Sequence, residues 1–333
     1  MSVPSVAIVG AGISGLACAR RLRDAGFAVE VFDKSRGVGG RLATRRAAFG
    51  EFDHGAQYFT ARDPRFAEQA RQWLDGGVVA QWTPRLAVID VIDGSAVCGA
   101  APEPTRRYVG VPAMNAIGKA LAADLQVRTS CTITRAVREA GGWRLEQAED
   151  APPTQFPRYD WLLGALPSPQ AAALFSDAPK VQAGARARPM VPCWAVLARF
   201  EAPLAAAFDA AFVNGSPLTW VARNGTKPGR APGECWVLHA ARDWSARHLE
   251  LDAAAITAPL LAEFARITGI HTQPSAVQAH RWRYSGPADP GGDPCLLEPA
   301  ERAGACGDWL AGARVEGAWL SGTALADALI AAR

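Results

Sequence analysis

Hydrophobic and polar positions follow two different periods along the first 33 residues of the chain. Val6 to Val9 form a continuous apolar run, and a second run follows at residues 28–32. Such short runs are typical of buried strands. Between them, after a turn rich in glycine, residues 12–25 place apolar side chains at helical spacing. The pattern predicts strand, turn, helix and strand in that order, which is the βαβ unit of a parallel sheet.

The turn of this unit has the spacing G-x-G-x-x-G. Gly10 would permit a tight turn, Gly12 would let backbone N–H groups approach a pyrophosphate, and Gly15 would let the helix pack close to the sheet. Asp33 ends the second strand, where a carboxylate can accept both hydroxyls of an adenosine ribose and disfavours a 2′-phosphate. A glycine turn alone can be purely structural, but here all the parts occur in the order that a dinucleotide site requires.

Two further segments carry candidate phosphate and flavin chemistry. Lys34 is followed by Gly39, Gly40 and Arg41, a thin backbone and a forked cation that can clamp a phosphate. The alternative is a solvated basic loop. Near the other end of the chain, residues 307–322 contain a Gly-Asp pair and then a predicted helix that begins near residue 315, which can also be an ordinary terminal helix with one packed face.

These segments resemble the GGR element and the C-terminal flavin motif of FAD-dependent amine oxidases and their flavoprotein relatives. The resemblance implies that Arg41 lies near the FAD pyrophosphate, that Asp308 accepts hydrogen bonds from the ribityl or pyrophosphate region, and that Ile133 lies beside the adenine. The cofactor-binding residues predicted in this way are Gly10, Gly12, Ile13, Ser14, Gly15, Asp33, Lys34, Gly40, Arg41, Ala56, Gln57, Ile133, Gly307, Asp308, Val315, Glu316 and Ala318.

Composition excludes several classes of protein. With 49% apolar residues, 20% charged residues and a net charge of +3, the chain of 333 residues is expected to be globular and not a nucleic-acid scaffold. Its seven cysteines show no CxxC pair, so we predict no disulfide framework and no metal site. It lacks a basic leader and any apolar run of membrane length, so we expect a cytoplasmic enzyme, a monomer or homodimer, with no membrane partner.

The resemblance also predicts the fold class and the domains. We expect an α/β protein with a Rossmann-like FAD-binding domain at residues 1–76, 108–167 and 280–333. A β-rich α+β substrate domain would be inserted at residues 77–107 and 168–279. Expected elements include helices at 115–125 and 252–268, strands at 125–129, 159–167, 192–200 and 235–240, and a hairpin over 133–147.

Segments 53–60, 218–230, 236–245 and 280–284, taken in order with residues 314–322, resemble the bacterial renalase branch of the flavin-containing amine oxidase superfamily. That resemblance implies oxidation of the 2- and 6-dihydro isomers of NAD(P)H to NAD(P)+, by hydride transfer to flavin N5, with O2 reduced to H2O2. The small-molecule substrate would contact Gln57, Tyr58, Trp220, His239, Trp282, Arg283 and Tyr284. The tryptophans and His239 can equally belong to the core.

Other classes stay open. Arg223, Arg230 or Arg283 could meet substrate phosphates. An amine or polyamine oxidase would usually place a lysine near N5, and of four lysines only Lys227 is a candidate, in a K-P-G-R loop that we expect at the surface or facing phosphate. An NAD(P)H-dependent reductase or monooxygenase, or a flavin-binding protein without turnover, is the third class. FAD is expected to be non-covalent, with Cys306 as the one cysteine to check.

Overall fold

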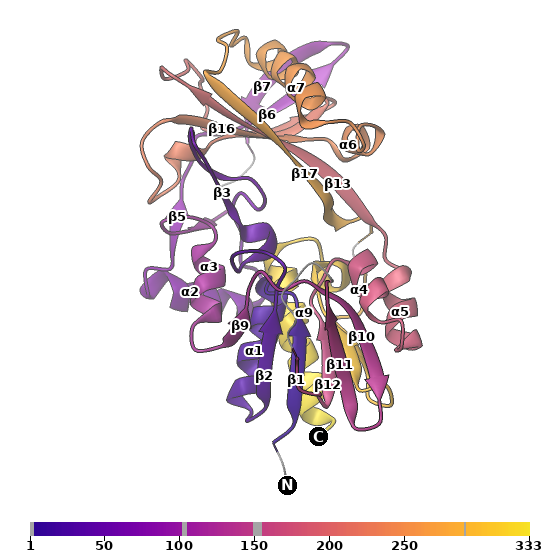
Figure 1. Ribbon diagram of the computed structural model, residues 1–333. Helices are drawn as coiled ribbons and strands as arrows, with labels where there is room; N and C mark the ends of the chain where they lie inside the picture. Colours follow the sequence, from indigo (N-terminus) through magenta and orange to yellow (C-terminus); the bar gives the residue numbers. More distant parts are fainter. Residues whose placement is uncertain (1–2, 102–104, 149–154, 290) are drawn as a thin grey trace.

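Two sheets stacked along the long axis of the molecule form the architecture (Figure 1). The computed structural model describes residues 3–101, 105–148, 155–289 and 291–333. Both termini lie at the end of the molecule that holds the first sheet. Long strands of the second sheet, β13 (Met190–Phe200) and β17 (Ala276–Pro287), run toward the first one and connect the two halves.

The first sheet has six strands in the order β18-β19-β12-β1-β2-β9. All neighbours are parallel except β18 and β19. Its strands are β1 (Ser5–Val9), β2 (Ala28–Phe32), β9 (Gln126–Arg128), β12 (Trp161–Gly164), β18 (Leu296–Glu298) and β19 (Ala303–Ala305). The order and the parallel direction confirm the Rossmann-like βαβ unit predicted from the first 33 residues.

Helices cover both faces of this sheet, which explains why β1 is apolar at consecutive positions. Val6 and Ile8 belong to the core under α1 (Ile13–Asp24), α3 (Ala116–Ala122) and α9 (Val315–Ala331). Ala7 and Val9 face the opposite core. That core is closed by α4 (Ser168–Leu174), α5 (Pro179–Arg186), α8 (Asp308–Ala311) and the hairpin of β10 (Ile133–Glu139) and β11 (Gly142–Gln147).

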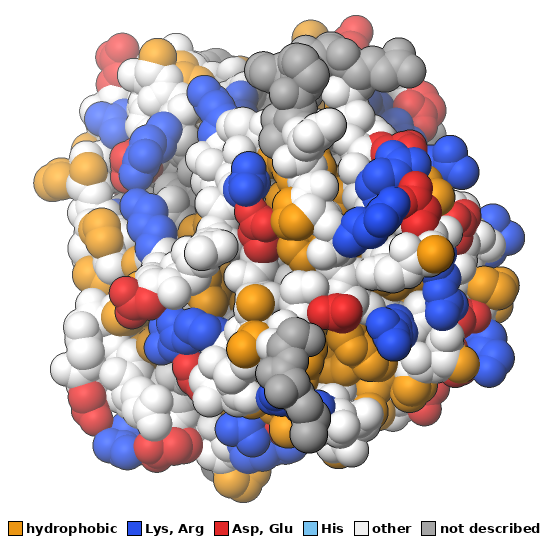
Figure 2. Space-filling view, turned by 60° about the horizontal axis from the view of Figure 1, so that its bottom comes forward, with side chains coloured by type: hydrophobic (Ala, Val, Ile, Leu, Met, Phe, Trp, Pro, Cys, Tyr) orange, Lys and Arg blue, Asp and Glu red, His pale blue; other side chains and the backbone are white. Residues whose placement is uncertain are grey.

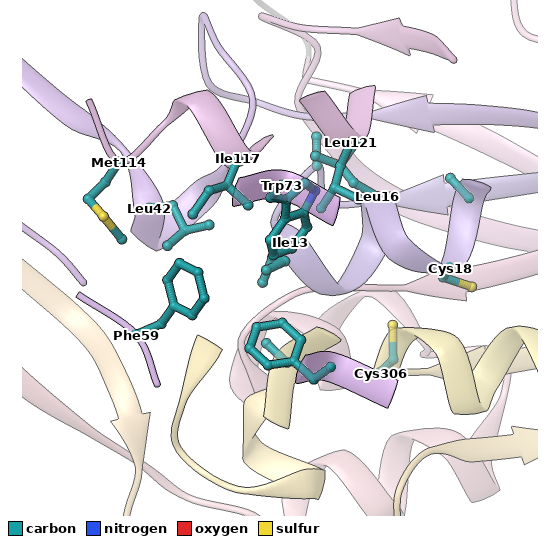
Figure 3. Packing of buried hydrophobic residues seen from close by; sticks show 14 of the residues in the cluster. Ile13, Leu16, Cys18, Leu42, Phe59, Trp73, Met114, Ile117, Leu121 and Cys306 are labelled. Carbon is teal, nitrogen blue, oxygen red and sulfur yellow. The ribbon is translucent and has the colours of Figure 1, made fainter. Parts of the chain in front are cut away.

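The core on the α1 side joins segments that are distant in the sequence. Ile13 and Leu16 of α1 lie against Ile117 and Leu121 of α3, and Leu42 extends the same cluster toward the centre of the molecule (Figure 3). Helix α2 (Pro64–Asp75) contributes to this core as well, and so does the two-stranded sheet of β5 (Val79–Trp82) and β8 (Arg107–Gly110).

The second sheet has seven strands in the order β17-β13-β16-β15-β14-β6-β7. Helices α6 (Arg242–Arg247) and α7 (Ala253–Thr268) pack on one face and close a separate hydrophobic core. The remaining strands are β6 (Leu86–Ile92), β7 (Ser95–Ala100), β14 (Ala210–Asn214), β15 (Leu218–Arg223) and β16 (Glu234–Ala240). A hairpin of β3 (Thr44–Ala47) and β4 (Gly50–Asp53) and the short helices η1 (Gly40–Leu42) and η2 (Asn224–Thr226) complete the described elements.

Packing shows which elements near the predicted domain boundaries contact which sheet. Helices α4 and α5 pack in the core of the first sheet, because their alanines and Leu174 cover its second face. Strand β5 also joins the first half through Val79 and Trp82. The second sheet takes residues 86–100 and the chain from β13 to the end of β17 at Pro287. The domain boundaries stay a prediction, because periodicity does not show which sheet an element joins.

Charge is distributed evenly over the face shown in Figure 2, where acidic and basic side chains are interspersed. None of the helices within the described residues combines the length and apolar character needed to cross a membrane. The described residues also contain no cluster of histidine, cysteine and carboxylate side chains suited to a metal ion.

Candidate active site

A single cavity of about 1920 Å³ extends between the two sheets. One end is lined by the glycine turn, Asp33 and Ile133, and the other by aromatic and histidine side chains of the second sheet. Pockets for drug-sized ligands usually measure about 300–1,000 Å³, so this cavity has room for a dinucleotide and a second molecule.

The glycine turn explains how the nucleotide end is built. Gly10 has a positive φ of 112°, and a Cβ there would lie 2.4 Å from the carbonyl oxygen of Ala165. A Cβ on Gly15 would lie 2.0 Å from the carbonyl oxygen of Gly10. By contrast, a Cβ on Gly12 would meet nothing within 4 Å. Gly10 and Gly15 are therefore required by packing, whereas Gly12 faces open space in the cavity.

Free hydrogen-bond donors at the start of α1 fit a phosphate. Gly12 is the N-cap residue and supplies no side chain to the first turn. The hydroxyl of Ser14 is buried without a hydrogen-bond partner among the described residues, although Ser14 lines the cavity. Unpaired N–H groups and the positive end of the helix dipole favour an anion at this place. The start of α1 therefore fits the pyrophosphate of a dinucleotide.

Asp33 is held in place by backbone donors. Its Oδ2 accepts from the N–H of Ala11 at 2.7 Å, and its Oδ1 accepts from the N–H of Ser35 at 2.7 Å. Asp33 lines the cavity next to Lys34. A carboxylate fixed at the end of β2 is placed as a ribose-binding residue must be.

Arg41 and Asp308, both predicted to bind the cofactor, form an ion pair with each other. The guanidinium group meets the carboxylate at two points, with N–O distances of 2.8 and 2.7 Å. Arg41 also donates to the carbonyl oxygen of Ser285 at 2.9 Å. Such a forked pair is geometrically specific. The pair of Arg41 and Asp308 joins η1 to the start of α8, and both side chains line the cavity.

Strands β16 and β17 of the second sheet supply one wall of the cavity. In β17, Ala279 enters the core under α7, whereas His280, Trp282 and Tyr284 line the cavity. In β16, Leu238 is in the core and His239 lines the cavity. Successive side chains of a strand point to opposite faces, which explains the change from core to cavity at these positions. Arg281 and Arg283 of β17 line the cavity as well.

Three of the five histidines meet at this wall. The ring centre of His54 lies 4.6 Å from that of His280 and 4.8 Å from that of Trp282. The Nε2 of His239 and the Nε1 of Trp282 both donate to the carbonyl oxygen of His54, at 3.0 and 2.9 Å. The Nδ1 of His54 in turn donates to the carbonyl oxygen of Ala43 at 3.1 Å. We call these four side chains the imidazole–indole wall.

The imidazole–indole wall is uncharged at neutral pH. Burial, together with the neighbouring His280, lowers the pKa of His54 to about 3. Burial lowers the pKa of His239 to about 4, and burial and Arg45 lower that of His280 to about 4. Three neutral imidazoles beside an indole present a weakly polar surface against which an aromatic ring can pack, although the rings are tilted against one another by 39° to 72°.

The cavity contains most of the predicted site residues. Of the substrate-side set it is lined by Tyr58, His239, Trp282, Arg283 and Tyr284, and of the cofactor set by Gly10, Gly12, Ile13, Ser14, Asp33, Lys34, Gly40, Arg41, Ala56, Ile133, Gly307, Asp308, Val315 and Ala318. Their contacts with a ligand stay predictions. The structure brings them together from both ends of the chain.

Four predicted residues do not line the cavity. Gly15 is packed under the turn, as described above. The amide of Gln57 is buried, with its Nε2 donating to the carbonyl oxygen of Asp53 and its Oε1 accepting from Lys227. Trp220 points into the core of the first half. The carboxylate of Glu316 accepts from two backbone N–H groups at the start of α2, at 2.6 and 2.7 Å.

Lys227 is neither at the surface nor facing phosphate, contrary to the prediction. It is fully buried, and its Nζ lies 3.3 Å from Oδ2 of Asp53 and 3.2 Å from Oδ1 of Asn224. Burial lowers the pKa of this lysine to about 8. Arg230 contacts the same carboxylate at 2.6 Å. The K-P-G-R loop therefore turns inward and closes a buried ion cluster behind the cavity floor.

The other candidates for substrate phosphate also have partners inside the protein. Arg223 lies 3.2 Å from Glu234 and against the ring of Trp236, away from the cavity. Arg283 lines the cavity but pairs with the exposed Glu250 at 2.7 Å. Cys306 is buried in the core and does not line the cavity, so its position does not favour covalent attachment of a cofactor.

Basic side chains dominate the cavity lining. The described lining residues include the basic side chains Lys34, Arg36, Arg41, Arg45, Arg46, Arg62, Arg107, Arg281, Arg283 and Arg314. Asp33 and Asp308 are the only carboxylates in this described lining, and both lie at the nucleotide end. Sequence reasoning missed Arg107, His54 and His280 as site residues. The two histidines could have been found from the sequence, because they lie within the segments 53–60 and 280–284, which also contain predicted site residues.

Comparison with known proteins agrees with the architecture. Residues 8–75 match the family model of the NAD(P)-binding Rossmann-like domain. A structure from Exiguobacterium sp. 255-15, provisionally named a protoporphyrinogen oxidase, is 14% identical over 100% of both chains, with a TM-score of 0.78. A triple mutant of putrescine oxidase with redesigned cofactor binding is 15% identical over 99% of each chain, with a TM-score of 0.74.

Wild-type putrescine oxidase bound to putrescine is likewise similar, at 15% identity over 99% of each chain and a TM-score of 0.70. The chain therefore has the fold of these oxidases over its whole length: a Rossmann-like nucleotide-binding half and a second, β-rich half. At this level of identity the likeness establishes the fold, and the chemistry has to be argued from the site.

Proposed function

We propose that this protein is an FAD-dependent oxidase of the renalase kind, which oxidises dihydronicotinamide dinucleotide isomers to NAD(P)+. The observation that carries the proposal is the continuous cavity from the α1 turn to the imidazole–indole wall. One end suits a dinucleotide cofactor, and the other presents neutral rings to a second, aromatic molecule. FAD, when bound, would accept a hydride from the substrate at N5 and pass the electrons to O2, which becomes H2O2.

The residues that would hold FAD are those of the nucleotide end. Gly12 and Ser14 would face its pyrophosphate, Asp33 its ribose, and Arg41 with Asp308 its central part. The start of α9 lies at the same cavity, and its N-cap Arg314 supplies no side-chain bond to the first turn. Free N–H groups there stabilise negative charge on a neighbouring ring.

The imidazole–indole wall has the properties that this substrate needs. A dihydropyridine becomes aromatic when it loses a hydride, so its oxidation does not require a strong base. The wall provides neutral imidazoles, and none of its four residues is a carboxylate or a lysine. Its role would be to orient the ring and to exclude water. His54 would act as a positioning residue, because its carbonyl oxygen fixes both His239 and Trp282.

Amine or polyamine oxidation is the second candidate, favoured by the structural likeness to putrescine oxidase. The arrangement of charges speaks against it. Lys227, the lysine that was a candidate for the position near N5, is held by Asp53, Asn224 and Gln57 and does not line the cavity. An NAD(P)H-dependent reductase or monooxygenase is the third candidate.

Anaerobic mixing of the holoprotein with one equivalent of reductant tests the proposal. Separate reactions would contain 6-dihydro-NAD, 2-dihydro-NAD, β-NADH and putrescine, with loss of the oxidised-flavin absorption band followed by stopped flow. We expect rapid bleaching by a dihydro isomer and slow or no bleaching by the other two. Bleaching by putrescine alone would establish the amine oxidase, and bleaching by β-NADH alone would establish the reductase or monooxygenase.

A further inference from the structure

Arg107, Trp82 and Trp220 pack around Tyr58, which lines the cavity, and each has a buried N–H donor with no hydrogen-bond partner among the described residues. The guanidinium carbon of Arg107 lies 5.3 Å from the centre of the Tyr58 ring. The ring centres of Trp220 and Trp82 lie 5.5 and 6.2 Å from it. The Nε of Arg107 and the Nε1 atoms of both tryptophans are buried and have no hydrogen-bond partner among the described residues.

Unpaired buried donors are costly and need a reason. A buried donor destabilises the folded protein when nothing replaces its hydrogen bond to water. Most buried polar groups in native proteins are satisfied by protein, water or ligand. Of these three side chains only that of Arg107 lines the cavity, as Tyr58 does, so the unpaired Nε of Arg107 indicates a place where a ligand supplies acceptor atoms.

The backbone holds Arg107 at this place. Arg107 is the first residue of β8 and pairs with Trp82 of β5. The next residue, Tyr108, exchanges two backbone hydrogen bonds with Phe59, at 2.8 and 2.9 Å, so β8 is joined to the segment that carries Tyr58. The arginine position is thus determined by the fold and does not depend on a flexible loop.

The guanidinium group of Arg107 lies over the Tyr58 ring and has no carboxylate partner among the described residues. Its Nη1 donates to the carbonyl oxygen of Thr105 at 3.0 Å, and no carboxylate of the described residues forms an ion pair with it. Two arginines of the cavity differ in this respect, because Arg46 pairs with Glu51 and Arg283 with Glu250. A guanidinium group with a free edge matches the geometry of phosphate and carboxylate groups.

We propose that Arg107 and Tyr58 form an oxyanion subsite that binds a phosphate or carboxylate group of the substrate. This inference rests on the proposed function and deepens it, because it names the residues that would bind an anionic group of the substrate. The basic residue Arg62 lines the same cavity, and both lining carboxylates are occupied elsewhere: Asp33 by backbone N–H groups and Asp308 by Arg41. An organic ammonium ion would meet Arg107 without a compensating carboxylate.

Binding of two ligands that differ by one phosphate tests the subsite. Nicotinamide mononucleotide and nicotinamide riboside carry the same ring, and only the first has a phosphate. Each would be titrated into the holoprotein by calorimetry, for the wild type, Arg107→Gln and Arg106→Gln. Arg106 is the matched control, because it is exposed and does not line the cavity, so its change removes the same charge beside the site.

We expect the wild type to bind the mononucleotide at least tenfold more tightly than the riboside. Arg107→Gln should weaken binding of the mononucleotide about tenfold or more and leave binding of the riboside unchanged. A tenfold loss corresponds to about 1.4 kcal/mol, close to the value of one charge-assisted hydrogen bond. Arg106→Gln should retain the wild-type ratio. Competition by inorganic phosphate or by acetate then distinguishes a phosphate subsite from a carboxylate subsite.

Several results would overturn the inference: equal weakening of both ligands by Arg107→Gln, an unchanged affinity for the mononucleotide, or the same effect from Arg106→Gln. Thermal unfolding of each variant separates these results from a folding defect. The measurement requires no turnover. If dihydro isomers fail to reduce the flavin while the phosphate preference still depends on Arg107, the proposed function is wrong and the subsite stands.

Discussion

At the scale of single residues, Asp53 shows how a buried charge is maintained behind the cavity. Burial by itself would raise the pKa of this carboxyl group. Lys227 and Arg230 lower the pKa by a larger amount, so the net pKa lies below its usual value. Thr44 and the backbone N–H of Met114 also donate to it, at 2.8 and 3.2 Å. One carboxylate thus compensates two buried cations.

Removal of this carboxylate should therefore cost more than removal of one cation. Asp53→Asn leaves Lys227 and Arg230 without a counter-charge and should lower the free energy of unfolding by about 3 kcal/mol or more. In Lys227→Met, Arg230 still neutralises Asp53, so a loss of about 1 kcal/mol is expected. Urea unfolding of both variants measures the difference. Equal losses would show that the cluster does not act through charge compensation.

The imidazole–indole wall makes stability depend on pH. His54 has a pKa of about 3 in the folded protein, whereas a histidine in the unfolded chain titrates near pH 6.5. Between these two pH values the unfolded state binds more protons than the folded state. The contribution of neutral His54 to stability is therefore complete above about pH 6.5 and is lost as the pH falls toward 3. When the pH falls from 7 to 5, the free energy of unfolding should decrease in both proteins. The decrease should be about 1–2 kcal/mol smaller in His54→Gln than in the wild type, because the variant lacks this titrating group.

Urea midpoints at the two pH values check this prediction. His271→Gln is the control, because His271 is exposed and lies outside the cavity. It should show the wild-type pH dependence, since all carboxylates and the other histidines are unchanged. If His54→Gln and His271→Gln behave alike, His54 is not the neutral, buried group that the structure shows.

At the scale of elements, the α1 turn separates packing from cofactor binding. Gly12→Ala adds a methyl group where no protein atom lies within 4 Å, at a residue with φ −73°, so the fold should tolerate it within about 0.5 kcal/mol. The methyl group would occupy the space proposed for the pyrophosphate. Gly15→Ala instead places Cβ 2.0 Å from the carbonyl oxygen of Gly10 and should destabilise the whole fold.

The amount of FAD retained after dialysis, together with urea unfolding of the apoprotein, distinguishes the two effects. We expect Gly12→Ala to lose FAD while its apoprotein keeps the wild-type midpoint, and Gly15→Ala to lose both. Full FAD retention by Gly12→Ala would place the pyrophosphate away from the α1 turn.

The same elements show which parts of the structure were predictable. The βαβ unit, the hairpin of β10 and β11 and helix α7 depend on local periodicity and turn residues, and their predicted positions agree with the structure within a few residues. The order of the second sheet depends on pairings such as β6 with β14, which join residues more than 100 positions apart. Lys227 was misjudged for the same reason, because its partner Asp53 is 174 positions away.

At the scale of the whole molecule, charge is concentrated inside the cavity and balanced outside it. The net charge of the chain is only +3, and both signs are mixed on the face of Figure 2, yet the described cavity lining holds ten basic residues against two carboxylates. A concave site lined by one sign of charge focuses the electric field and attracts the opposite charge. The approach of an anionic substrate should therefore depend on salt.

Salt should affect capture of the substrate and leave the chemical step unchanged. Raising the ionic strength from about 0.01 to 0.15 M shortens the screening length from about 30 to 8 Å. For 6-dihydro-NAD this should lower kcat/KM severalfold with little change in kcat. Sodium chloride and potassium chloride at equal ionic strength should act alike, which excludes binding of one particular cation. A kcat/KM that does not respond to salt would mean that the basic lining is neutralised by the bound cofactor, and that substrate recognition depends on contacts at the imidazole–indole wall alone.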